Sequence, residues 1–287
     1  MATRRNNLER TKAPSTDSPI STTATQNTTG DNLFSFVTPT EFVELPSRGR
    51  FYSEDHPLRD AETVEIKHMT AKEEDILTSE TLLKKGLAIN RLISSILVNP
   101  NIEVDSLLLG DKNAILVASR ITGFGPFYNV NTACPDCKKK SETIFNLEDI
   151  TQNYADDLPD DVELLEDGSF SMTLPTSGVT VAVKLLTSKD ETFIARQFET
   201  KKKLKKADTT ITDLLKAIMV GVNEHTDTET LHKFVDMMPM RDVTHLRKQY
   251  EKAKPDLDLK FDYECNDCGH AGRVVMPMTA QFFWPNQ

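Results

Sequence analysis

Apolar residues recur along the first half of this chain with strand or helix periodicity. The alternation over 64–69 is typical of a strand, and Thr70-Ala-Lys-Glu73 then has the capping-box pattern that begins a helix. Leucine and isoleucine at three- and four-residue steps predict a helix over 82–97. A further helix, capped by Asp111, is expected to end near Gly123.

The second half mixes the two periodicities. Alternation over 179–186 predicts a strand, and Ser188-Lys-Asp-Glu191 repeats the capping-box pattern before a helix. Apolar spacing over 211–222 predicts another helix, and two shorter helices are expected over 228–237 and 240–253. Together these segments predict an α+β protein in which helices pack with short antiparallel strands.

All four cysteines of the chain stand in two CxxC pairs, each between two roughly alternating arms. This layout predicts two β-hairpins with a CxxC at each tip. Two such tips can close a tetrahedral four-thiolate zinc shell, which leaves no open position for a substrate. The sequence therefore predicts one structural Zn²⁺ that joins the hairpins, with the ligands Cys134, Cys137, Cys265 and Cys268.

Other chemistry is open to these thiols but fits less well. A redox-active CxxC would need only one pair, at a helix N-terminus. Disulfides would suit a secreted chain, but no apolar run follows the basic residues of Met1–Arg5, so we expect reduced thiols. His270 could donate a hydrogen bond to a thiolate, although an exposed hairpin residue is the favoured interpretation.

Length, charge and composition exclude several classes of protein. The chain has 287 residues and a net charge of −10, which disfavours general binding of polyanions. No stretch approaches the ~20 apolar residues of a membrane span. Residues 1–31 are rich in Ser and Thr and predict a disordered N-terminal arm, followed by a body over 32–287. An inert leader is favoured over an arm that orders on a partner.

Catalytic signatures are missing from the sequence. It contains no phosphate-binding glycine loop, no HExxH and no GxSxG. The six histidines form no ligand-spaced set, and the acidic segment over 156–167 lacks the pattern of a calcium-binding loop. We therefore expect a protein that is not an enzyme, with no catalytic or cofactor-binding residues.

Two other segments have alternative interpretations. Lys138–Lys140 and Lys201–Lys206 could contact phosphates, which makes a zinc-ribbon nucleic-acid-binding regulator the alternative function, although solvated lysine faces are favoured. The aromatic run Phe282–Trp284 would be costly to leave in water, at about 2 kcal/mol for each side chain. It either folds back onto the core, which is slightly favoured, or docks in a neighbour.

Five features taken in order, from about residue 40 onward, resemble the baseplate hub subunit or hub assembly family of T4-type contractile-tailed bacteriophages. The features are Leu45–Tyr52, Met69–Leu77, Gly110–Leu116, the two cysteine hairpins and Phe282–Pro285. The resemblance implies a structural or assembly role without catalysis. It also implies other tail and hub proteins as partners, with the tape-measure protein as a further candidate, and a location in the host cytoplasm during assembly or in the virion.

Overall fold

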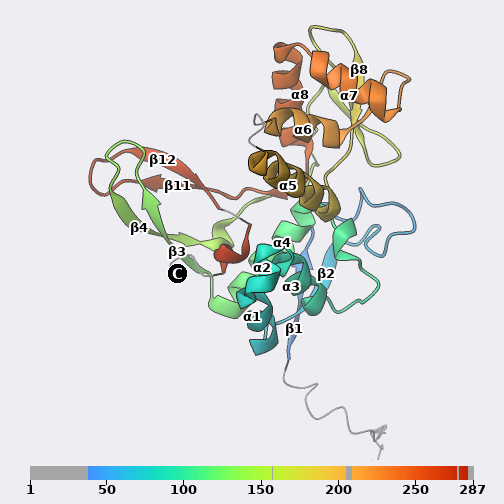
Figure 1. Ribbon diagram of the computed structural model, residues 1–287. Helices are drawn as coiled ribbons and strands as arrows, with labels where there is room; N and C mark the ends of the chain where they lie inside the picture. Colours follow the sequence, from blue (N-terminus) through green and yellow to red (C-terminus); the bar gives the residue numbers. More distant parts are fainter. Residues whose placement is uncertain (1–37, 157, 205–208, 277, 284–287) are drawn as a thin grey trace, which may run out of the picture. The chain divides into compact units, whose positions relative to one another are not determined.

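The computed structural model describes residues 38–156, 158–204, 209–276 and 278–283 (Figure 1). The arm predicted over 1–31 and the side chain of Trp284 lie outside these described residues. The chain from Thr38 onward belongs to one compact unit. No helix in the described part has the length and apolar character needed to cross a membrane.

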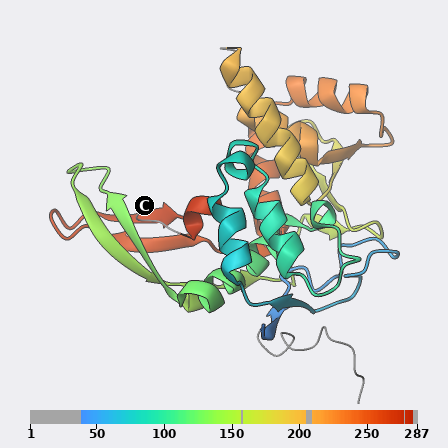
Figure 2. The same ribbon diagram turned by 60° about the horizontal axis from the view of Figure 1, so that its bottom comes forward.

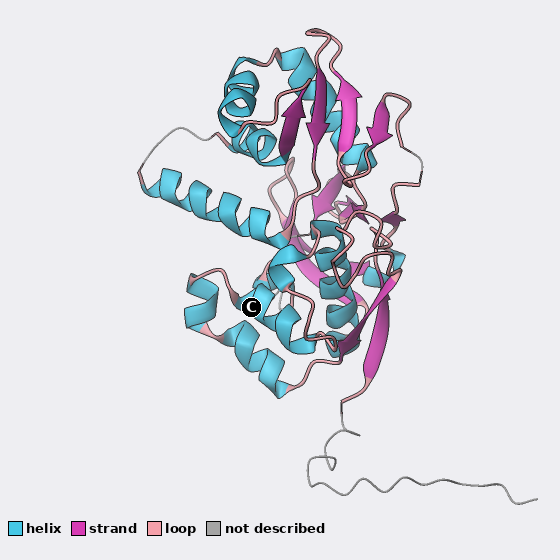
Figure 3. Ribbon diagram, turned by 90° about the vertical axis from the view of Figure 1, so that its right-hand side faces the viewer, coloured by secondary structure: helices cyan, strands magenta, loops and turns pink. Residues whose placement is uncertain are grey.

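Helices and short strands are interspersed along this unit, as Figure 3 shows by colour. The helices are α1 (Ala71–Thr78), α2 (Glu80–Lys84), α3 (Ala88–Ile96), α4 (Leu109–Phe124), α5 (Ser188–Lys203), α6 (Thr210–Ile218), α7 (Thr228–Met237) and α8 (Met240–Ala253). The strands are β1 (Thr40–Glu44), β2 (Thr63–Lys67), β3 (Phe127–Ala133), β4 (Lys140–Asn146), β5 (Gln152–Asn153), β6 (Val162–Leu164), β7 (Phe170–Thr173), β8 (Thr180–Val183), β9 (Met219–Val222), β10 (Asp256–Leu257), β11 (Lys260–Glu264) and β12 (Ala271–Val275).

Every named strand pairing is antiparallel. Strands β6 to β9 form one four-stranded sheet in sequence order, and the other sheets are the pairs β1–β2, β3–β4, β5–β10 and β11–β12. Two-stranded sheets are only marginally stable alone, so each must gain its stability from packing against other elements. The predicted α+β class is thus confirmed.

Helix α4 lies at the centre of the packing. Its residues from Gly110 to Leu116 are mostly buried, and Ile115 is fully inaccessible to solvent. At its start, Gly110 touches the chain next to β10: a Cβ there would lie 2.2 Å from the carbonyl oxygen of Pro255. Only glycine allows the helix and this segment to approach so closely.

Two predicted helices are shorter in the structure. The predicted helix over 82–97 is split at Gly86, whose φ of 66° belongs to the left-handed region. Helix α3 buries its apolar face, whereas no residue of α2 is buried. The predicted helix over 211–222 ends at Ile218, because Met219–Val222 forms β9 and pairs with β8. Apolar spacing alone did not distinguish a helix from a helix followed by a strand.

Helix starts were predicted with mixed success. Thr70 and Glu73 form the expected capping box at α1, and α7 and α8 have the predicted bounds. The second box is displaced by one residue, because Thr187 and Asp190 supply the reciprocal hydrogen bonds instead of Ser188 and Glu191. Thr187 has the extended backbone that an N-cap requires.

The end of the described chain folds back onto the core. Phe282 and Phe283 are buried at 0% and 1% exposure. The ring of Phe282 lies 5.3 Å from that of Tyr128 on β3, and the ring of Phe283 lies 6.1 Å from that of Phe124 at the end of α4. The core-packing prediction is therefore confirmed for these two residues of the aromatic run.

Candidate metal centre

The two predicted cysteine hairpins are β3–β4 and β11–β12, and they lie side by side in Figures 1 and 2. Their tips have the same backbone hydrogen bonds. Cys134 N donates to the carbonyl oxygen of Lys139 at 2.9 Å, and Cys265 N donates to that of His270 at 2.9 Å. Each tip is therefore a rigid turn that directs two sulfur atoms toward the same side.

The equivalence extends to backbone torsions. The residue four positions after the first cysteine of each pair donates its N–H back to that cysteine, from Lys138 at 3.0 Å and from Gly269 at 2.8 Å. Both residues have left-handed φ, 60° and 70°. The weak repeat in the sequence thus corresponds to two copies of one turn, although only the second copy uses glycine.

The four sulfur atoms converge between the tips. Cys134 Sγ lies 3.7 Å from Cys268 Sγ, and Cys137 Sγ lies 3.7 Å from Cys265 Sγ. All four lie within 4.8 Å of one another, and all four cysteines are free thiols. The sequence expectation that residues more than a hundred positions apart would meet here is confirmed.

These separations suit a tetrahedral thiolate site. A metal–sulfur distance of 2.3 Å corresponds to sulfur–sulfur edges of about 3.8 Å in a regular tetrahedron. The two 3.7 Å contacts match such edges, and they are far longer than the 2.05 Å of a disulfide bond. The cluster can therefore hold a four-coordinate metal ion such as zinc.

The two thiols of the second tip differ in acidity. The backbone N–H of His270 favours the Cys268 thiolate, but burial and hydrogen bonds with the neighbouring thiols outweigh it and raise the pKa of Cys268, whereas the pKa of Cys265 is lowered. Backbone N–H groups of Asp267 and Cys268 lower the pKa of the Cys265 thiol to about 7. A thiolate is the form that ligates metal, so this sulfur requires little further stabilisation near neutral pH. An ion pair between Lys139 and Asp267, at 2.6 Å, joins the two tips outside the sulfur cluster.

Aromatic contacts join the hairpins below the sulfurs. The rings of Phe145 on β4 and Phe261 on β11 lie 4.8 Å apart. Within the second hairpin, Tyr263 is buried against its cross-strand partner Gly272, where a Cβ would come within 2.9 Å of its ring. The hairpins therefore have an apolar contact of their own, and the sulfur cluster lies at its outer end.

The remaining sequence candidates have other roles. The His270 ring makes no hydrogen bond among the described residues; its carbonyl oxygen serves the tip turn. In the acidic segment, Asp156 pairs with Arg48 and Arg50 at 3.1 and 3.0 Å, and Asp167 accepts from Ser169. These carboxylates thus have protein partners.

The prediction that Asp111 caps α4 is wrong. The helix begins after Leu108 without a side-chain cap, and Asp111 is the third residue of its first turn, fully buried. Its carboxylate accepts from Ser47 N at 3.0 Å, from Ser47 Oγ at 2.6 Å and from Tyr52 OH at 2.7 Å. Sequence reasoning missed this cluster because the donors precede Asp111 by about sixty residues.

One serine–histidine pair resembles a nucleophile and its base. His56 Nε2 lies 2.8 Å from Ser106 Oγ. Because Nδ1 accepts the N–H of Leu58, Nε2 carries the proton and donates to Ser106, whose hydroxyl donates to the carbonyl oxygen of Glu103 at 2.7 Å. Ser106 therefore faces no base, and the pair is a structural hydrogen-bond chain.

Comparison with known proteins identifies the family of this chain. A family model described as T4 bacteriophage base plate protein matches residues 38–284. The chain belongs to this family. Comparison with curated proteins gave no match, and comparison with solved structures gave none. Membership implies a structural role in the phage tail baseplate, with other tail proteins as partners, and such base plate proteins are typically not enzymes.

Two of the segments that carry the resemblance contact each other in the structure. Leu45–Tyr52 and Gly110–Leu116 meet around Asp111, which accepts hydrogen bonds from the first segment. Arg48 and Gly49 turn the first segment with left-handed φ values of 47° and 70°. The two segments are therefore halves of one packing arrangement.

Proposed function

We propose that this base plate protein is a subunit or an assembly factor of the baseplate hub of a T4-type contractile-tailed phage. The observation that carries the proposal is the family match over residues 38–284. The order of the five resembling segments supports the hub in particular. The protein would act in the host cytoplasm during assembly and in the tail baseplate, through contacts with hub proteins and the tape-measure protein.

We also propose that Cys134, Cys137, Cys265 and Cys268 bind one structural Zn²⁺. Support comes from the 3.7 Å sulfur contacts and from the four thiols supplied by two matched turns. When bound, the ion would be a fixed crosslink between the hairpins, with no chemistry at an open position. The residues between the tips would then form a closed loop whose ends are held together.

The alternative of a nucleic-acid-binding regulator receives less support from the described lysines. Lys139 is paired with Asp267 and Lys201 with Asp213, each at 2.6 Å. Lys138, Lys140, Lys202 and Lys203 form no ion pair among the described residues, and Lys205 and Lys206 lie outside them. The two predicted phosphate-binding runs therefore each contain one lysine that is already neutralised. An ammonium group that is already paired with a carboxylate neutralises a phosphate less well, so its binding releases fewer of the counterions condensed on the nucleic acid.

Affinity capture from infected cells tests the hub proposal. Tagged full-length protein is recovered from infected-cell lysate, with and without nuclease, and its partners are identified by mass spectrometry. Hub, tape-measure or other baseplate proteins that stay bound after nuclease would support the proposal. Partners that disappear with nuclease would favour the regulator. A tagged unrelated phage protein expressed at the same level gives the background.

A further inference from the structure

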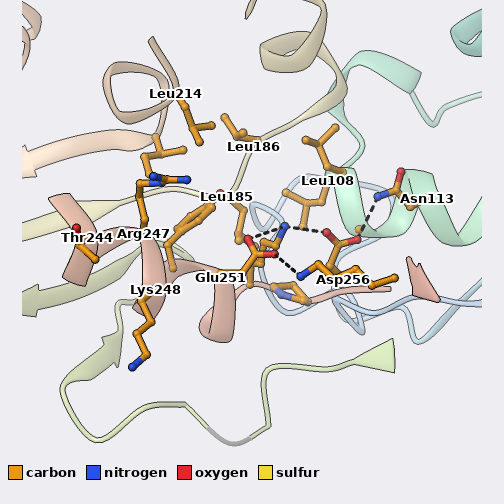
Figure 4. Close-up of a pocket in the computed structure, with 17 residues that line it drawn as sticks. Leu108, Asn113, Leu185, Leu186, Leu214, Thr244, Arg247, Lys248, Glu251 and Asp256 are labelled. Atoms are coloured by element: carbon orange, nitrogen blue, oxygen red, sulfur yellow. Dashed lines mark hydrogen bonds and ion pairs between the residues drawn. The ribbon is translucent and has the colours of Figure 1, made fainter. Parts of the chain in front are cut away.

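A cavity of about 710 Å³ lies between α4, α6 and α8, on a part of the unit distinct from the sulfur cluster (Figure 4). Much of its lining is aliphatic: Leu108 and Leu185 are buried in the wall, and Leu186 and Leu214 are partly exposed. Covering a partly exposed aliphatic wall of this kind with an apolar side chain is favourable, because it removes apolar surface from water.

One end of the cavity has its polar groups satisfied. Lys254 pairs with Glu251 at 3.2 Å and with Asp256 at 3.0 Å. Asn113 donates to the same Asp256 carboxylate at 3.1 Å. The ammonium group of Lys260 also lies 4.0 Å from Glu251, so two cations balance the two carboxylates and this end offers little attraction to a charged ligand.

The other end presents an arginine without an acidic partner. Arg247 on α8 is exposed and forms no ion pair with any residue that the structure describes. In Figure 4 its side chain lies beside Leu214, whereas that of the next residue, Lys248, extends away from the other labelled side chains. A ligand that carries a carboxylate next to a leucine would complement this end in both charge and polarity.

The chain itself carries such a group at the tip of the β6–β7 hairpin. Leu164 and Leu165 are 43% and 37% exposed, and Glu166 directly follows them with no ion pair among the described residues. The tip is a defined turn, since Leu165 N donates to the carbonyl oxygen of Ser169 at 2.8 Å and Gly168 has a φ of 79°. It would therefore lose little conformational entropy on binding.

We propose that this cavity receives the β6–β7 tip of a second copy of the chain, with Leu165 against the aliphatic wall and Glu166 beside Arg247. Donor and acceptor are different surfaces, so the contact is head-to-tail and could repeat into a ring or an open filament. Each copy carries a net charge of −10, which opposes association, and the contact area is small. We therefore expect weak, concentration-dependent association. The proposal is independent of the hub assignment.

Sedimentation velocity of the full chain, up to about 100 μM, tests this contact. The wild type should sediment faster as concentration rises. Arg247→Glu and Glu166→Lys should each remain monomeric. Lys252→Glu makes the same charge change at an exposed position of α8 that does not line the cavity, and it should behave as the wild type. The double variant Arg247→Glu/Glu166→Lys should associate again, because it restores an opposite-charge pair.

Several results would overturn the contact. A wild type that stays monomeric over the whole range excludes it, as does association unchanged by both single variants. If Lys252→Glu lost association equally, the effect would come from net charge alone. If the double variant stayed monomeric, Arg247 and Glu166 would not be a pair. Circular dichroism of every variant shows whether the fold is kept, and Glu166→Lys at an exposed tip provides a second test if Arg247→Glu does not fold.

Discussion

Asp111 is a fully buried carboxylate held by Ser47 and Tyr52. Burial raises its pKa, and the hydrogen bonds from Ser47 and Tyr52 offset only part of this effect. The folded carboxyl therefore binds its proton more tightly than the unfolded one, and its contribution to stability falls as the pH rises from the unfolded pKa through the folded pKa. Ionisation of the buried Asp111 carboxyl is unfavourable, but the carboxylate oxygens accept hydrogen bonds from buried donors of Ser47 and Tyr52.

We predict that Asp111→Ala lowers the free energy of unfolding by about 2–4 kcal/mol, because Ser47 N, Ser47 Oγ and Tyr52 OH lose a shared acceptor inside the core. Urea unfolding followed by circular dichroism measures the change. Asp75→Ala on the exposed face of α1 is the control and should change stability by less than about 0.5 kcal/mol. Equal effects at the two positions would contradict the structural role of the cluster.

For helices and strands, the sequence pattern predicted the features that depend on residues close together in the chain. The hairpins were predicted because alternation and a CxxC turn need no distant information, and the box at Thr70 involves residues three apart. The second box was misplaced because Thr187 and Asp190 fit the same pattern one residue earlier. The role of Asp111 depends on donors about sixty residues away. Such pairing is a property of the fold, which one sequence does not reveal.

The capping box of α5 gives a pH-dependent prediction. Burial alone would raise the pKa of Asp190, but hydrogen bonds from Lys184 and Thr187 outweigh it and lower the pKa. A lowered folded pKa means that the carboxylate stabilises the protein above its unfolded pKa and loses this effect as pH falls through the folded pKa. Asp190→Asn should therefore cost about 1 kcal/mol at pH 7. The cost should shrink as the pH falls below about 4.

Urea unfolding of wild type and Asp190→Asn across this pH range measures the difference. Glu199→Gln on the same helix, at an exposed position without a charged partner in the described residues, is the matched control. It should show almost no cost at either pH. A cost for Asp190→Asn that is constant from pH 7 to pH 3 would mean that the carboxylate acts through shape and not through charge.

For the whole molecule, the sulfur cluster matters because of where its ligands lie in the chain. The tips are separated by more than a hundred residues, so a crosslink there would constrain α5 to α8 as well as the hairpins. Closing a long loop removes more unfolded-state entropy than closing a short one. The apolar contact of Phe145 with Phe261 has no such effect on the unfolded chain, although it helps the folded hairpins to meet.

We predict that the purified protein contains about one zinc per chain, measured by elemental mass spectrometry, and that chelation lowers its Tm by roughly 10 °C or more. Cys265→Ser should reproduce the effect, because three thiolates leave the shell incomplete. Lys139→Gln removes the adjacent ion pair with Asp267 but no ligand, so it should keep the zinc and most of the stability. A metal-free wild type with an unchanged Tm would mean that hairpin packing alone holds the tips. If Lys139→Gln lost zinc as completely as Cys265→Ser, the site would depend on charge between the tips more than on the four sulfurs.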